Sequence, residues 1–137
     1  MELNQQDQAP NYDWQEQHER AAGKEQDRYG KLSVTDILHR VELGQYGEYN
    51  MIWHTLAEEA MLQQAGWTLF RVLQRDEVDY LIRCNCAEAL LELLGRTDVL
   101  QTLNEAVNLT KGSPAERQPY LLALEGELTQ QLGAKPA

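Results

Sequence analysis

From residue 33 onward, hydrophobic residues recur at the three- and four-residue spacing of amphipathic helices. The pattern predicts six helices, over about 34–43, 48–64, 67–74, 78–94, 98–109 and 114–132. We find no run of alternating β-branched residues that indicates a strand. The sequence therefore predicts an all-α fold without a β-sheet.

Residues that typically cap or end helices support these boundaries. Ser113 to Glu116 form a capping box with proline at the first helical position, and Thr97 is expected to cap the fifth helix. Glycines are expected to end four of the helices, namely Gly44, Gly66, Gly95 and Gly133. In the fifth helix we expect four apolar residues to face inward: Leu100, Leu103, Ala106 and Val107.

The helices group as short and then long, three times. The short ones begin near 34, 67 and 98, a spacing typical of helical repeats. The helix over 78–94 has a narrow polar face of Asn85, Glu88 and Glu92, which predicts a central position. We therefore expect a short α-solenoid of about three antiparallel helix pairs.

The helix over 78–94 also resembles the second helix of a HEAT repeat. The matching positions are Asp79, Ile82, Arg83, Cys86, Ala87, Ala89 and Leu90. The resemblance covers residues 33–110 and is weaker in the first and third pairs. It implies a right-handed stack whose concave face binds another macromolecule, with small residues where neighbouring pairs approach. Tetratricopeptide-like pairing is the alternative.

Residues 1–31 differ from the remainder, residues 32–137. They contain six Gln, seven acidic and four basic residues and few aliphatic side chains. This composition predicts a polar, flexible N-terminal segment ahead of a helical repeat domain. The alternative is that Tyr12 and Trp14 clip the segment onto the domain or a partner.

The charge narrows the choice of partner. The net charge is −10, of which −7 falls after residue 31, with 15 acidic and 8 basic residues there. Nucleic acids and anionic membranes attract basic surfaces, so neither is expected as a partner. The sequence shows neither a membrane-spanning run nor a signal peptide. Cys84 and Cys86 are expected to point to nearly opposite sides of one helix, so they cannot pair, and we interpret them as small packed residues in a reducing cytoplasm.

Candidate chemistry is sparse. His54 and Glu58 share a helix face, but two ligands are fewer than a metal site needs. We find no nucleophile motif and no phosphate-binding glycine loop, so we expect no enzyme, metal or cofactor. A metal-dependent helical enzyme that uses these two residues is the least favoured alternative.

Candidate partner-binding residues come from the first two pairs. Exposed tyrosines and tryptophans are common binding anchors, and carboxylates suit a basic partner. The candidates are Tyr46, Glu48, Tyr49, Trp53, His54, Glu58, Asn85, Glu88 and Glu92.

Small acidic HEAT-like proteins resemble bacterial inhibitors, including immunity proteins that neutralise a toxin. The main expectation is thus an inhibitor of a basic protein, and the alternative is an adaptor, such as a lyase-like helper, of an enzyme or secretion system. The sequence leaves the oligomeric state open.

Overall fold

The computed structural model describes the backbone of residues 2–136 and the side chains of residues 13–136. Over this range the protein is all-α, with seven helices and no strand. The helices are α1 (Glu2–Gly30), α2 (Val34–Glu42), α3 (Met51–Glu59), α4 (Leu62–Leu73), α5 (Tyr80–Leu93), α6 (Val99–Thr110) and α7 (Pro114–Leu132). The predicted fold class is confirmed at this level.

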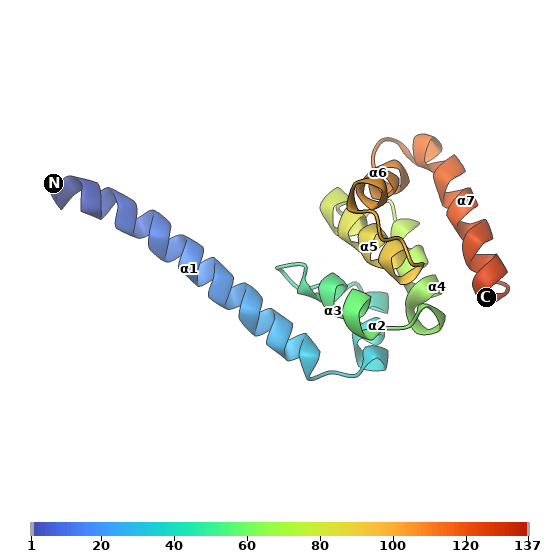
Figure 1. The fold of residues 1–137 in the computed structure, drawn as a ribbon, viewed down its shortest axis with the longest axis horizontal. Helices are drawn as coiled ribbons and strands as arrows, with labels where there is room; N and C mark the ends of the chain where they lie inside the picture. Colours follow the sequence, from blue (N-terminus) through green and yellow to red (C-terminus); the bar gives the residue numbers. More distant parts are fainter. Residues whose placement is uncertain (1, 137) are drawn as a thin grey trace.

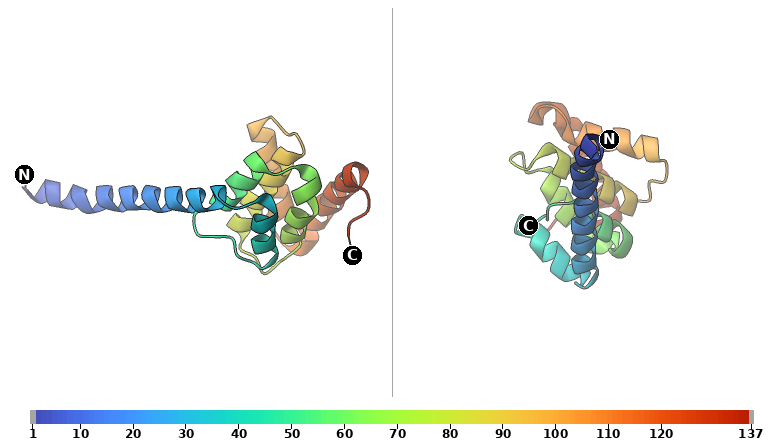
Figure 2. Two further views of the ribbon diagram at one scale, coloured as in Figure 1. Left: turned by 90° about the horizontal axis from the view of Figure 1, so that it is seen from below. Right: turned by 90° about the vertical axis from the view of Figure 1, so that its left-hand side faces the viewer.

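The helices pack in two layers. In one layer α1 packs on α3, α3 on α5, and α5 on α6, and in the other α2 packs on α4 and α4 on α7. Contacts of α2 with α3, α4 with α5, and α6 with α7 join the layers. Figure 1 shows α1 leaving this body at one side and α7 closing the opposite side, and the left view of Figure 2 shows the same arrangement from below. Helix α5 packs on α3, α4 and α6, which agrees with its predicted central position.

The third helix pair is placed in the opposite sense to the first two. In the first two pairs, α2 and α4 share one layer and α3 and α5 share the other. In the third pair the first helix, α6, packs on α5, and the second helix, α7, packs on α4. The third pair therefore does not repeat the placement of the first two.

Several predicted helix ends are confirmed by cap geometry. The Ser113 hydroxyl accepts from the Glu116 N–H, and the Glu116 carboxylate accepts in return from the Ser113 N–H. The Asp79 carboxylate accepts from the Leu81 N–H at the start of α5. At α6 the prediction is wrong by one residue, because Asp98 rather than Thr97 accepts from the N–H of Gln101.

The boundary between the second and third predicted helices is also wrong. The chain breaks at Ala60 and Met61, both in extended conformation, and α4 begins at Leu62. Gly66 is buried inside α4 instead of ending a helix. A Cβ atom on Gly66 would lie 2.8 Å from a methyl carbon of Leu132, so this glycine allows α7 to approach α4.

The inward face predicted for α6 is only half right. Ala106 is fully buried, but Leu100 and Leu103 are 68% and 42% exposed. Helix α6 ends its layer, with α5 and α7 as its main neighbours, so little covers its outer side. Val99 at the first position is 83% exposed, and the three residues form an apolar stripe open to solvent.

A buried carboxylate fastens α1 to α3. Glu25 is 2% exposed and accepts the backbone N–H groups of Glu48, Tyr49 and Met51 over 2.7, 2.9 and 3.3 Å. The side chain of Asn50, the residue before α3, makes no capping hydrogen bond, so Glu25 takes that role from another helix. A negative charge at a helix N-terminus also meets the positive end of the helix dipole.

The N-terminal segment is thus helical as far as Gly30, and its last turns pack on the body. The predicted boundary at residue 31 falls in the turn after α1, and the predicted flexibility stays a prediction. Trp14 is exposed and stacks on His18, whose ring meets the edge of Tyr49. The Tyr12 side chain lies outside the described residues.

Most of the α5 positions that resemble a HEAT repeat in sequence lie where the helix meets its neighbours. Arg83 is buried, and its guanidinium donates to the carbonyls of Val78 and Thr110, each over 3.0 Å. It therefore ties the start of α5 to the end of α6. The small or apolar members of the motif, Cys86, Ala87, Ala89 and Leu90, are buried, and Ile82 is half-buried.

Candidate functional site

An open groove of about 540 Å³ runs along the exposed side of α5. One wall comes from α3 and the residue before it, and the far end comes from the start of α6 and the loop that precedes it. The lining residues used below are Trp53, His54, Asn85, Glu88, Glu92 and Arg96, with Val99 and Thr102 on α6. The groove thus collects side chains from three helices of one layer.

Helical geometry places the groove residues of α5 together. Asn85, Glu88 and Glu92 are three and four residues apart, so their side chains follow one face over about two turns. The opposite side of α5 carries Cys86 and Leu90, which are fully buried. The narrow polar face predicted from the sequence is therefore the face that lines the groove.

The groove is electrostatically negative. Among the described residues, no cation pairs with Glu88 or Glu92 within ion-pair distance. The one arginine in the groove lining, Arg96, is held by two carboxylates. Its guanidinium donates two hydrogen bonds of 2.7 Å to Glu127 and one of 3.4 Å to Glu105. The two free carboxylates therefore dominate the charge that an occupant would meet.

This arginine and the carboxylate facing it perturb each other. Hydrogen bonds from Arg96 lower the pKa of Glu127 below its ordinary value, against the effect of burial. The pKa of Arg96 is raised by the same hydrogen bonds. The pair stays charged, so it fixes the loop before α6 against α7.

Trp53 carries a buried indole N–H that lacks an acceptor within the described part of the chain. The residue lines the groove but is only 2% exposed, and its Nε1–H finds no acceptor among the described residues. The ring packs against Tyr46, with the ring centres 5.5 Å apart. A buried N–H without an acceptor is unfavourable by about 1–3 kcal/mol, so such groups are rare in folded proteins.

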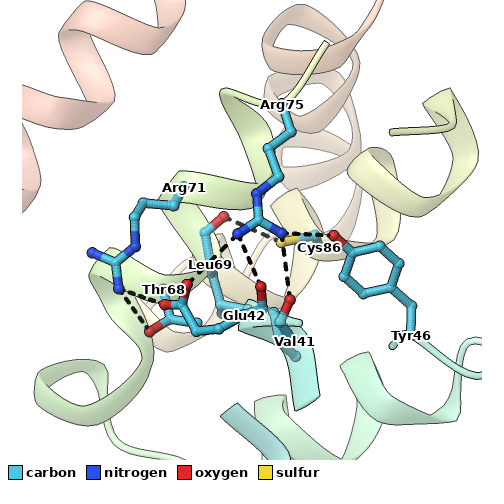
Figure 3. Close-up of polar contacts among 8 residues, drawn as sticks. All are labelled: Val41, Glu42, Tyr46, Thr68, Leu69, Arg71, Arg75 and Cys86. Atoms are coloured by element: carbon cyan, nitrogen blue, oxygen red, sulfur yellow. Dashed lines mark hydrogen bonds and ion pairs between the residues drawn. The ribbon is translucent and has the colours of Figure 1, made fainter. Parts of the chain in front are cut away.

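Tyr46, predicted as an exposed anchor, is half-buried and already has a polar partner. Its hydroxyl accepts a 3.0 Å hydrogen bond from Arg75, which also donates to the carbonyls of Val41 and Glu42. Figure 3 shows this arginine reaching over the last residues of α2 toward the tyrosine ring. Tyr46 therefore stabilises the end of α2 and lies outside the groove lining.

Three other candidates also lie outside the groove lining. Tyr49 is half-buried against α1 through His18, and the N–H of Glu48 is held by Glu25. Glu58 is exposed on α3, one turn after His54. The structure thus brings together Trp53, His54, Asn85, Glu88 and Glu92 and leaves the remaining four candidates outside the groove lining.

Sequence reasoning missed the groove residues on and before α6. Val99 and Thr102 reach the groove only because α6 packs beside α5, a placement that repeat spacing does not predict. The available signal was an apolar residue, Val99, directly after the capping Asp98. The inward face predicted for this helix, Leu100, Leu103, Ala106 and Val107, does not include Val99.

The described residues contain no group of three or more His, Cys, Asp or Glu side chains that could hold a metal ion. Over the same part of the chain, no helix combines the length and the apolar character needed to cross a membrane. Burial raises the pKa of both thiols, Cys84 and Cys86, and the buried Cys86 donates to the carbonyl of Leu69. Neither cysteine has the lowered pKa of a reactive thiol.

Comparisons with protein-family models, with curated proteins and with solved structures give no match.

Proposed function

We propose that this chain is a non-catalytic protein-binding module that covers a basic surface of another protein and thereby inhibits it. The observation that carries the proposal is the groove on α5, where Glu88 and Glu92 lie without a cationic partner among the described residues. Carboxylates in a partly enclosed groove attract cationic side chains and speed encounter with a positively charged partner.

The arrangement of helices supports this proposal at the level of architecture. We interpret α2–α3 and α4–α5 as two HEAT-like pairs and α6–α7 as a divergent third pair that ends the stack. Terminal repeats often diverge because one of their faces meets solvent. Such stacks present extended faces to macromolecules, and the groove lies on the layer that contains α3, α5 and α6.

The overall charge agrees with a basic partner in the cytoplasm. The net charge is −10, and basic proteins such as nucleases would be attracted to this surface over a Debye length of about 8 Å at physiological salt. An adaptor role would use the same groove, because an adaptor also needs a partner surface. The difference is whether the partner loses activity when it is bound.

The test is capture from cells that express the chain. We expect a strongly basic protein to bind the wild type at low salt, to be released by high salt, and to be lost with Glu88→Gln/Glu92→Gln. Glu59→Gln/Glu77→Gln is the matched control, since it removes the same charge from exposed residues outside the groove lining. Addition of the purified chain should then reduce the activity of that protein. Equal capture by both double variants would contradict the proposal.

A further inference from the structure

The groove on α5 continues into the apolar stripe on α6. Val99 belongs to both, since it lines the groove and is 83% exposed, and Leu103 lies one turn further along α6. Leu100 adds a third exposed side chain beside them. An acidic channel with an apolar edge is thus open to one occupant that has both a basic and an apolar face.

We propose, resting on the protein-binding function above, that this surface takes an amphipathic basic helix of the partner protein. Glu88 and Glu92 are one turn apart, and arginines or lysines one turn apart on a facing helix have the matching spacing. Leucine-type residues on the adjoining face of that helix pack on Leu100 and Leu103. Recognition of a helix through such anchors is a recurring mode of peptide binding.

Charge complementarity decides between this occupant and a second copy of the chain. Two copies would bring the free carboxylates of Glu88 and Glu92 toward another surface of a chain with a net charge of −10. The repulsion between like charges disfavours that contact, while a basic helix neutralises both carboxylates. An anionic lipid surface is disfavoured for the same reason.

Trp53 provides a spectroscopic reporter for the groove, because the residue contributes to the groove lining. Its Nε1–H is buried and has no acceptor among the described residues, although Trp53 lines the groove. The N–H signal of this indole in an NMR spectrum therefore reports on the groove, and Trp53→Phe assigns it among the three tryptophans of the chain.

The probe is a fluorescein-labelled peptide of about five helical turns with leucines on one face and arginines on the adjoining face. A peptide of identical composition but scrambled order is its control. Addition of the full chain should raise the fluorescence anisotropy of the first peptide, and the affinity should fall as the salt concentration rises. Addition of the peptide should shift the Trp53 indole signal. Binding of the scrambled peptide with equal affinity would overturn the inference, because charge alone would then explain it.

Two pairs of variants separate the acidic and apolar parts of the surface. Glu88→Gln/Glu92→Gln should weaken binding about tenfold and flatten its salt dependence, since each exposed ion pair contributes up to about 1 kcal/mol. Leu100→Ser/Leu103→Ser should also weaken it about tenfold but leave the salt dependence unchanged. The matched controls, Glu59→Gln/Glu77→Gln and Leu43→Ser/Leu122→Ser, alter exposed residues outside the groove and should bind as the wild type does.

The outcome also distinguishes this inference from the proposed function. If capture of a partner is lost with Glu88→Gln/Glu92→Gln but unchanged with Leu100→Ser/Leu103→Ser, the proposal of an amphipathic helix is wrong, and the protein-binding function stands. If the patterned peptide fails to bind while that partner binds, the conclusion is the same. If neither the peptide nor any partner depends on the groove, both proposals fail.

Discussion

Replacement of Glu25 tests whether one buried carboxylate holds α1 on the body. In Glu25→Ala the backbone N–H groups of Glu48, Tyr49 and Met51 lose their acceptor. Hydrogen bonds to charged groups contribute about 1.5–3 kcal/mol each, and loss of a helix cap usually costs about 1 kcal/mol. Removal of the carboxylate also removes the free-energy cost of burying its charge, and this offsets part of the loss. We therefore expect the free energy of unfolding to fall by about 3 kcal/mol.

The assay is urea unfolding followed by far-ultraviolet circular dichroism at pH 7, with Glu19→Ala as the control. Glu19 lies on the same helix but is exposed, so its loss should change the free energy of unfolding by less than about 0.5 kcal/mol. Glu25→Gln retains one acceptor oxygen. Its loss in free energy of unfolding should therefore lie between those of the other two variants, at about 1.5 kcal/mol. Hydrogen exchange of the Glu48 and Tyr49 amides should quicken in the same order.

One result would refute the argument for this cap. If Glu25→Ala unfolds at the same urea concentration as Glu19→Ala and its Glu48 and Tyr49 amides exchange no faster than in Glu19→Ala, the three hydrogen bonds do not stabilise the contact between α1 and α3. A fall confined to the amide protection of Glu48 and Tyr49, with unchanged global unfolding, would mean that α1 detaches without affecting the body.

Three further predictions follow from other contacts. Because the pKa of Glu127 is lowered in the folded state, the stability that it gains from Arg96, about 1 kcal/mol, is fully present above about pH 5 and is lost as the pH falls through that lowered pKa. Urea unfolding of Glu127→Gln and wild type should therefore show a larger difference at pH 7 than at pH 3. Gly47→Ala should destabilise by at least about 2 kcal/mol in the same assay, since φ is +75° and the new Cβ would lie 2.6 Å from the carboxylate that holds α1; wild-type stability would contradict the packing. With a thiol reagent at pH 8, Cys84 should react slowly and Cys86 only after unfolding, since the latter is fully buried; two fast thiols in the native protein would disprove this.

Local signals in the sequence were sufficient for most helix ends. Ser113 and Glu116 satisfy each other's N–H groups within a single turn, so their capping depends on neighbouring residues alone. Gly95 takes a φ of +92° after α5, where a residue without a Cβ is favoured. These features involve contacts within a few residues, and such contacts are encoded by short patterns.

Contacts between distant segments were not predictable in the same way. Gly66 has the appearance of a helix terminator, yet it lies inside α4 because Leu132, far along the chain, approaches there. Glu25 was one of many charged residues in a polar segment, and only the fold brings the α3 N-terminus to it. In each case the chemistry of the residue is ordinary, and its role depends on a partner more than 20 positions away.

The candidate groove combines both kinds of information. The polar face of α5 follows from helical periodicity, so Asn85, Glu88 and Glu92 could be grouped from the sequence. The far end of the groove depends on α6 lying beside α5, and Arg96 supports that placement by binding Glu105 on α6 and Glu127 on α7. If the third pair had repeated the sense of the first two, α7 would lie beside α5 and the apolar stripe of α6 would lie away from the carboxylates. The departure from a regular repeat is therefore the feature that joins an acidic face to an apolar one, and the amphipathic partner that we propose depends on it.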